Sequence, residues 1–258
     1  MNNAALDIRL EARSLQKSFG GLMATDNLSL EVAHGEIHAV IGPNGAGKTT
    51  LVHLLSGLLR PDGGQIVFEG RDITRLSASA RVRRGLARSF QITSIFREFT
   101  ALENVMLAVQ AGQGHSFRFW RPVMQDLRLI DPAREMLERV GLGARTDVQA
   151  GNLAHGEQRQ LEIAISLATD PTFLLLDEPM AGMGPEESQG MIAFLKELKR
   201  DYTMLLIEHD MDAVFALADR ITVLVYGRVI ATGTPDEIRN DATVRAAYLG
   251  GDETGEVA

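Results

Sequence analysis

The sequence predicts an α/β fold with a mainly parallel sheet at its core, an antiparallel β part at the N-terminus and an inserted helical section. Three observations support this prediction. Short apolar segments alternate with helical segments in the second half of the chain, and apolar strands joined by helices are typical of parallel sheets covered on both faces. The first third carries strand patterns separated by turns, and residues 100–140 carry helical periodicity.

The N-terminal third is expected to supply the antiparallel strands. Residues 6–12 and 28–32 alternate or cluster apolar side chains as short strands do. A further short strand is expected over residues 65–69, between turns that contain glycine. Residues 37–41 are mostly apolar and lead directly into a glycine-rich loop, so we expect them to be a core strand whose end carries a functional site.

The helical section is expected between about residues 100 and 140, where two sets of apolar residues recur at helical spacing. These residues are Leu102, Val105, Met106, Val109, Met136, Leu137 and Val140. Strand and helix then alternate again, with buried strands expected at residues 173–176 and 203–207 and a helix at residues 186–199. Pro185 stands at a favoured first helical position, and residues 221–225 and 229–231 are predicted to form a closing hairpin.

Length, charge and composition limit the classes of protein to consider. The chain has 258 residues, enough for one large domain, and no cysteine, which excludes disulfides and thiolate metal sites. Its formal net charge of −8 opposes attraction to nucleic acid phosphates. It has no apolar run of the roughly 20 residues needed to span a bilayer and no signal-peptide pattern at its start. We therefore expect a protein that is soluble as made, with no nucleic acid partner.

The glycine-rich loop after residues 37–41 has the spacing of a P-loop, which binds nucleoside triphosphates. Its glycines allow successive backbone N–H groups to turn inward onto phosphate oxygens, and the helix that begins near Lys48 adds its positive end. Lys48 can reach the β- and γ-phosphates, and the Thr49 hydroxyl can ligate Mg²⁺. The predicted nucleotide-binding residues are Gly42, Pro43, Asn44, Gly45, Ala46, Gly47, Lys48, Thr49 and Thr50.

Two carboxylates end the buried strand predicted at residues 173–176. In an α/β sheet the ends of such strands open onto the ligand crevice. Asp177 is placed to hold Mg²⁺, directly or through water, whereas Glu178 is placed to orient and deprotonate a water that attacks the γ-phosphate. The pair therefore has the pattern of a Walker B motif followed by a general base.

A turn that opens a helix, residues 153–160, carries the next motif: Ala154, His155, Gly156 and Glu157. This segment resembles a variant of the signature motif of ABC transporter ATPases, and the order of P-loop, helical insertion, signature and Walker B is that of the family. The resemblance covers nearly the whole chain. It implies a P-loop NTPase fold of ABC type, with a single ATPase domain over residues 1–258. A helical subdomain at about 92–168 would be inserted in a RecA-like core, and residues 232–258 would form a C-terminal tail.

The same resemblance assigns three further residues. Gln91 matches the Q-loop glutamine that senses Mg²⁺ and the attacking water, His209 matches the switch histidine at the γ-phosphate, and Phe19 matches the aromatic that stacks on adenine. Gln91, His209 and Glu178 are the expected catalytic residues. Thr49, Gln91 and Asp177 are the expected metal ligands, with ATP and Mg²⁺ as cofactors.

Two positions depart from the family pattern. Ala154 stands where the signature commonly has serine, so a hydroxyl that could bond the γ-phosphate is missing and the Gly156 region and helix N-terminus are left to bind it. Gly184 stands where the family often carries aspartate after the Walker B motif. The first departure predicts weaker affinity for the partner's nucleotide, and the second puts the usual contact between two subunits in doubt.

The resemblance also implies partners. In the family two ATPase subunits pair head to tail, each P-loop facing the other's signature, so this chain requires a second ATPase subunit, identical or homologous. Its helical insertion and Q-loop would contact a membrane subunit at the cytoplasmic face of the inner membrane. The assembly would contain two membrane permease subunits, and a substrate-binding protein would act indirectly. The sequence motifs around Gly156, Ala181, Glu208 and residues 233–250 resemble those of the ATPases of branched-chain amino acid importers. The ATPases of urea, amide or aromatic-acid importers share much of these motifs, so these importers are alternatives.

Other functions are disfavoured. An ABC-type ATPase that acts on DNA or ribosomes would carry a coiled coil or a second cassette with a basic linker. The cluster of Arg81, Arg83, Arg84 and Arg88 is interpreted as a solvated face. The aromatic and basic segment 117–122 is either a contact for a permease or headgroups, or part of the packing of the helical subdomain. A binding module without turnover is disfavoured because Glu178 is present.

Overall fold

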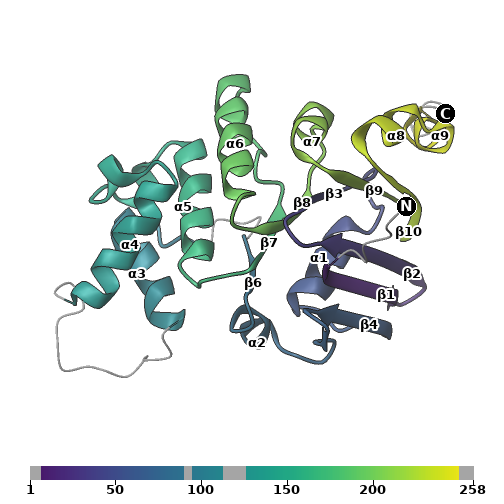
Figure 1. Ribbon diagram of the computed structural model, residues 1–258, viewed down its shortest axis with the longest axis horizontal. Coiled ribbons are helices and arrows are strands. Elements are labelled where there is room, and N and C mark those ends of the chain that lie inside the picture. Colours follow the sequence, from purple (N-terminus) through teal and green to yellow (C-terminus); the bar gives the residue numbers. More distant parts are fainter. Residues whose placement is uncertain (1–6, 90–94, 113–125, 250–258) are drawn as a thin grey trace. The chain divides into compact units, whose positions relative to one another are not determined.

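The computed structural model describes residues 7–89, 95–112 and 126–249 (Figure 1). The chain divides into two compact units, Met1–Arg81 with Leu198–Ala258, and Val82–Glu197. Gln91 and the segment 117–122 lie outside the described residues. No helix in the described ranges is long and apolar enough to cross a bilayer.

The first unit contains the predicted antiparallel sheet, with strands in the order β2-β1-β4-β5. These strands are β1 (Ile8–Phe19), β2 (Leu22–Ala33), β4 (Gly63–Phe68) and β5 (Arg71–Asp72). β1 and β2 are longer than the predicted segments 6–12 and 28–32. The pairing of β1 shifts register between Ala12 and Leu15, and Ser14 between them has a φ of 49°. This bulge interrupts the alternation of side chains, so the continuation of β1 is hidden in the sequence.

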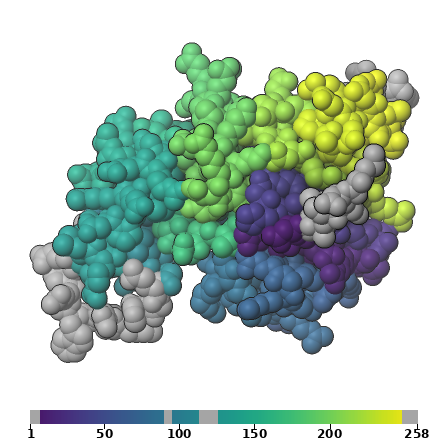
Figure 2. Space-filling model, in the orientation of Figure 1, coloured from purple at the N-terminus to yellow at the C-terminus, as the bar shows by residue number. Residues whose placement is uncertain are grey.

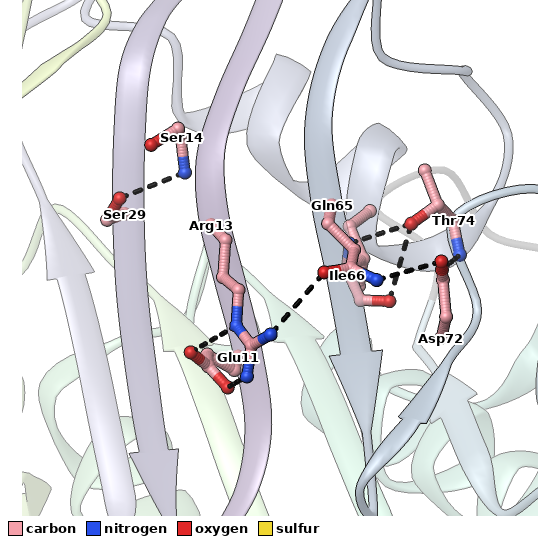
Figure 3. A network of polar contacts seen from close by, with 8 residues as sticks. All are labelled: Glu11, Arg13, Ser14, Ser29, Gln65, Ile66, Asp72 and Thr74. Carbon is pink, nitrogen blue, oxygen red and sulfur yellow. Dashed lines mark hydrogen bonds and ion pairs between the residues drawn. The ribbon is translucent and has the colours of Figure 1, made fainter.

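Hydrogen bonds between exposed side chains link three strands of this sheet and the turn that follows them (Figure 3). Glu11 accepts from Arg13 at 2.5 and 2.6 Å, and Arg13 reaches Gln65 at 3.4 Å. Asp72 accepts from the side chain of Gln65 at 2.9 Å and from the backbone N–H of Thr74 at 2.8 Å. Hydrogen bonds from Thr74 and Gln65 lower the pKa of Asp72 to about 2, since they favour the charged carboxylate.

The core strands of the first unit are β3 (Ile37–Ile41), β8 (Thr203–Ile207), β9 (Arg220–Val225) and β10 (Arg228–Gly233). β3 pairs in parallel with β8 and with β9, and β9 pairs antiparallel with β10. Every residue of β3 and β8 is buried, as the apolar runs predict. The parallel strands and the closing hairpin are therefore confirmed.

Three helices cover these strands: α7 (Met211–Leu217), α8 (Pro235–Asn240) and α9 (Ala242–Leu249). Val214, Ile238 and Val244 join Ile41 and Ile221 in one apolar cluster. In Figure 2 α8 and α9 form a yellow mass on the surface of the unit. The described part of residues 232–258, which the sequence predicts as a tail, thus contains packed helices because Ile238 and Val244 bury their side chains against the core strands.

A buried polar chain crosses the core strands of this unit. His38, which is fully buried in β3, lies 2.7 Å from Glu36 Oε1 through Nδ1 and 2.8 Å from Thr222 Oγ1 through Nε2. Thr222 Oγ1 in turn lies 2.8 Å from Thr232 Oγ1. Buried polar groups need such partners, so the chain fixes the alignment of β3, β9 and β10 beneath the glycine-rich loop.

The helix after the glycine-rich loop, α1 (Lys48–Ser56), ends against a buried arginine. Arg81 in α2 (Ala78–Val82) is 1% exposed and donates to the carbonyl oxygens of Leu54 at 2.7 Å and Leu55 at 2.6 Å. Burial lowers the pKa of Arg81 to about 10. The interpretation of Arg81 as part of a solvated face is therefore wrong: its charge caps the carbonyl end of α1.

The second unit holds the predicted helical insertion. Its helices are α3 (Ala101–Gly112), α4 (Leu127–Arg139), α5 (His155–Leu167) and α6 (Pro185–Leu198), with short 3₁₀ helices at Gly143–Arg145 and Ala150–Asn152. Leu102, Val105, Met106 and Leu137 are buried, as their helical spacing predicts. Two parallel strands, β6 (Leu86–Arg88) and β7 (Phe173–Asp177), belong to the same unit. Pro185 is the first residue of α6, as expected.

Candidate nucleotide-binding and hydrolysis site

The glycine-rich loop lies between β3 and α1 in the first unit, in the predicted order of strand, loop and helix. Gly45 has a φ of 78°, and Gly47, which caps α1, has a φ of 101°. These conformations are open to glycine and strained for other residues. α1 begins at Lys48, so its first N–H groups and its positive end face the loop. The geometry is that of an anion site.

The loop is held closely by two neighbouring backbone segments. A Cβ atom on Gly47 would lie 2.4 Å from the carbonyl oxygen of Ala24 in β2, so only glycine fits there. Gly227, in the turn between β9 and β10, donates its N–H to the Ala46 carbonyl at 2.9 Å and accepts from the Asp26 N–H at 2.9 Å. Arg228 beside it pairs with Asp26 at 2.6 Å. The sequence pattern indicates this turn only as part of a hairpin, whereas in the structure it also holds the glycine-rich loop in place.

Lys48 bends back over the loop. Its Nζ donates to the carbonyl oxygens of Gly42 at 2.5 Å and Pro43 at 3.0 Å. Asn44, Gly45 and Thr49 are exposed, so the mouth of the loop and the hydroxyl-bearing first turn of α1 face solvent. A phosphate could therefore approach the backbone N–H groups and the ammonium together.

Phe19 ends β1 and is 48% exposed. The Nζ of Lys17 lies 5.7 Å from the centre of its ring. An exposed aromatic of this kind offers a flat face for stacking, and the nearby cation interacts with the ring. That its partner is adenine remains a prediction.

His209 follows β8, the strand next to β3. Because β3 and β8 are parallel, with Val40 opposite Ile207, the glycine-rich loop and His209 leave the sheet at the same edge. The His209 side chain is 64% exposed, and its Nδ1 lies 3.8 Å from Oε2 of Glu208, whose side chain is buried. The structure thus brings the predicted histidine and the P-loop to one edge, and adds Glu208, which the sequence had not singled out as a functional residue.

The two predicted carboxylates lie in the second unit, at the end of β7. Asp177 is the last residue of the strand and is 3% exposed. Its Oδ2 accepts from Nη2 of Arg88, the last residue of β6, at 2.8 Å. The interpretation of Arg88 as part of a solvated face is therefore wrong as well. β6 has only three residues, which is too short a pattern to reveal a buried strand in the sequence.

Glu178 follows Asp177 and is partly exposed. Its φ of 50° places the backbone in the left-handed region, which costs a residue with a side chain about 1 kcal/mol. The chain turns here, since the Ala181 N–H donates to the Glu178 carbonyl at 3.1 Å. Because the chain turns at this point, Glu178 is partly exposed whereas Asp177 is buried. The two neighbouring carboxylates can therefore serve different roles.

The predicted signature residues form the start of α5. Ala154 occupies the N-cap position with extended backbone angles, and its N–H donates to Oε2 of Glu157 at 2.9 Å. No side-chain cap reaches the first turn of α5, because alanine has no oxygen to supply it. A Cβ on Gly182, in the loop after β7, would lie 2.8 Å from Nε2 of His155. The second unit therefore brings the signature and the loop that contains Gly184 side by side.

Residues that suit Mg²⁺ occur in both units. Mg²⁺ is usually bound by one or two protein oxygens together with phosphates rather than by a cage of protein ligands. Within the described ranges, no group of three or more His, Cys, Asp and Glu side chains could hold a metal. The exposed Thr49 hydroxyl of the first unit and the Asp177 carboxylate of the second each offer an oxygen of the kind that Mg²⁺ prefers.

Two protein-family models match this chain. The family model described as ABC transporter matches residues 25–181, and the model described as branched-chain amino acid ATP-binding cassette transporter matches residues 228–254.

Two curated relatives are similar over most of their length. The high-affinity branched-chain amino acid transport ATP-binding protein LivG of Salmonella typhimurium is 42% identical over 251 residues, covering 93% of this chain and 97% of the relative. The protein BraF of Pseudomonas aeruginosa, which has the same description, is 39% identical over 248 residues and covers 93% and 97%.

A solved structure is similar to this chain over almost its whole length. The ADP conformation of MJ1267, an ATP-binding cassette of an ABC transporter, matches with a TM-score of 0.85 and 31% identity, covering 94% of this chain and 99% of that chain.

Proposed function

The chain belongs to the ABC transporter family as one of its ATP-hydrolysing subunits, and we propose that it powers an importer of branched-chain amino acids. The observation that carries the cargo assignment is the match of residues 228–254 to the branched-chain family model, together with 42% identity to LivG. Urea, amide or aromatic-acid importers remain the alternative cargo classes, because an ATPase subunit does not touch the cargo.

In this proposal the P-loop holds the triphosphate. The backbone N–H groups of residues 44–50 and the positive end of α1 bind phosphate oxygens, and Lys48 moves from the Gly42 and Pro43 carbonyls onto the phosphates. Phe19 stacks on the adenine. Thr49, Gln91 and Asp177 would hold Mg²⁺, which would offset the charge of the phosphates.

Hydrolysis in this proposal depends on three side chains. Glu178 orients the attacking water and accepts its proton, and Gln91 helps to position that water. His209 contacts the γ-phosphate from the sheet edge that it shares with the P-loop. The buried carboxylate of Glu208 limits the positions that His209 can take, since it accepts the His209 backbone N–H at 3.0 Å.

The signature segment binds the nucleotide of a second subunit. The first turn of α5, with Ala154, His155, Gly156 and Glu157, has N–H groups that no side chain caps and that can bind a γ-phosphate. Two ATPase subunits, identical or homologous, therefore enclose ATP between them. Closure would move two permease subunits, with this chain at the cytoplasmic face of the inner membrane and a substrate-binding protein delivering cargo.

The direct test is to purify the chain with the membrane subunits that bind it in its own cells and to reconstitute them in vesicles. We expect Mg²⁺-dependent ATP hydrolysis and ATP-driven uptake of radiolabelled leucine, isoleucine or valine when the binding protein is supplied. Uptake of urea or an aromatic acid instead would overturn the cargo assignment and leave the ATPase assignment intact. Lys48→Ala should abolish tight ATP binding; normal affinity in that variant would contradict the P-loop assignment.

A further inference from the structure

We propose that Arg88 is a positioning residue for hydrolysis, which fixes the Asp177 carboxylate in the orientation needed to hold Mg²⁺. This inference rests on the proposed function. Its core observation is a buried ion pair: Arg88 Nη2 lies 2.8 Å from Asp177 Oδ2, and the two side chains are 7% and 2% exposed.

The backbone explains why Arg88 reaches Asp177. β6 and β7 are parallel, with Arg88 opposite Leu175, and the N–H of Ser89 donates to the Leu175 carbonyl at 3.0 Å. Asp177 is two residues further along β7, which corresponds to about 7 Å along the strand. An extended arginine side chain spans that distance, whereas a shorter side chain does not. The ion pair therefore follows from the register of the two strands.

Helix α5 contacts the backbone of Arg88. The Ser166 hydroxyl of α5 lies 3.4 Å from the Arg88 carbonyl oxygen. α5 also carries the buried pair Arg159–Glu162, joined at 2.8 Å, and Glu162 shares with Arg88 a cavity of about 250 Å³. Arg88 is thus packed between the strand that carries Asp177 and the helix that begins with the signature segment.

The physical consequence concerns orientation. A buried carboxylate is held in one rotamer only if its partners fix it, and a guanidinium does so with a rigid, planar set of donors. A lysine ammonium carries the same charge on a shorter side chain and without the planar guanidinium. If Arg88 positions Asp177, then Arg88→Lys should impair metal-dependent hydrolysis although the charge is conserved.

The experiment compares Arg88→Lys with wild type in the purified protein. Four quantities are measured: kcat, KM for ATP, ATP affinity without metal, and the affinity of Mn²⁺ for the ATP complex by electron paramagnetic resonance. We expect kcat to fall about 10- to 100-fold and Mn²⁺ binding to weaken several-fold, with metal-free ATP affinity unchanged. Arg84→Met, which removes an exposed arginine of the same segment, is the matched control and should change none of these.

A purely structural role would give a different result. Arg88→Lys would then lower the thermal unfolding temperature but leave kcat and Mn²⁺ affinity of the folded protein at wild-type values, which would overturn the proposal. If Arg88→Lys does not fold, Arg88→Gln is measured in its place. Its side chain is uncharged and too short to reach Asp177, so kcat and Mn²⁺ affinity should fall at least as far, and wild-type values of both would overturn the proposal.

The variant Asp177→Asn separates this inference from the proposed function. In that background Arg88→Lys should weaken Mn²⁺ binding by less than about twofold more, since the pair is already broken. An additive effect would overturn the positioning role. If Asp177→Asn itself leaves Mg²⁺-dependent hydrolysis unchanged, the assignment of Asp177 as a metal ligand fails. If Asp177→Asn abolishes hydrolysis while Arg88→Lys does not affect it, only the present inference fails.

Discussion

At the scale of single residues, the site depends on backbone conformations that particular side chains exclude. Gly45 and Gly47 both have positive φ, but only Gly47 is also in close contact, with the Ala24 carbonyl. Glu178 has a side chain and still takes a φ of 50°, at the position proposed for the general base. A strained residue at a reacting position is a recurrent feature of functional sites, because surrounding structure must hold it there.

The two glycines give a matched pair of variants. Gly45→Ala should lower the free energy of unfolding by about 1 kcal/mol, from the strained φ alone, since a Cβ there meets nothing within 4 Å. Gly47→Ala should lower it by about 3 kcal/mol, because its Cβ would also lie 2.4 Å from the Ala24 oxygen. Urea unfolding without nucleotide measures both. Equal losses would contradict the close contact.

Asp72 predicts a pH dependence of stability. Its pKa of about 2 in the folded protein is below the ordinary value of 3.8, so the unfolded chain binds the proton more tightly. The resulting stabilisation is fully present above about pH 4 to 5 and is lost as the pH falls through about 2. The difference in melting temperature between wild type and Asp72→Asn should therefore be larger near pH 6 than near pH 2. A difference that does not change with pH would show that the hydrogen bonds to Asp72 are absent in solution.

At the scale of elements, the ends of helices decide much of the site. The start of α5 has an alanine at its N-cap, whereas α8 has a full capping box in which Thr234 accepts from Glu237 at 3.3 Å and Glu237 accepts from Thr234 at 2.8 Å. α1 ends against the buried Arg81. An uncapped N-terminus keeps its N–H groups available to an anion, and a capped C-terminus fixes the helix that carries Lys48 and Thr49.

Ala154→Ser should supply the missing cap of α5. The extended backbone angles of Ala154 suit a serine N-cap, whose hydroxyl would accept from the first turn. We expect the free energy of unfolding of the isolated chain to rise by about 1 kcal/mol. Urea unfolding of the variant and of wild type measures this change. A fall in stability would show that the first turn of α5 is not as described.

Arg81→Met should be much more damaging than the loss of an exposed arginine. It leaves buried carbonyl oxygens at the end of α1 without their donor, and we expect a loss of about 3 kcal/mol in the free energy of unfolding. Arg84→Met, on the exposed part of the same segment, should change it by less than about 0.5 kcal/mol. Chemical denaturation of both variants tests the distinction between a buried cap and a solvated basic face.

At the scale of the whole molecule, the proposed mechanism requires two copies of the motifs. Each chain has one P-loop and one signature segment, and in the proposal they serve different nucleotides. In this proposal ATP binding and hydrolysis control the association of two subunits, and that association moves the permease.

Glu178→Gln should uncouple these steps. It keeps the shape of the side chain but cannot accept the water proton, so steady hydrolysis should fall at least about 100-fold while ATP binding persists. ATP should then accumulate in a stable dimer, which light scattering detects. Lys48→Ala is the control, because it should bind ATP weakly and remain monomeric. Unchanged turnover in Glu178→Gln would defeat the assignment of the base.

The sequence by itself determined the fold class, most strands and helices, and the family. The reason is that these features depend on local pattern: the apolar runs at residues 37–41 and 203–207, the helical spacing of residues 102–109, and glycine, lysine and threonine at fixed offsets in the P-loop. Phosphate binding by backbone N–H groups needs only a short continuous segment, so a sequence motif can predict it directly.

Only the tertiary structure decided which polar residues are buried and which residues they contact. Arg81 and Arg88 belong to one basic cluster in the sequence, but the first caps α1 and the second pairs with Asp177, because strands and helices distant in sequence meet around them. The hydrogen bond from Gly227 to Ala46 in the P-loop is also a tertiary contact, since the two residues are about 180 positions apart in the sequence. Such contacts depend on which elements are neighbours in space, which no local pattern encodes.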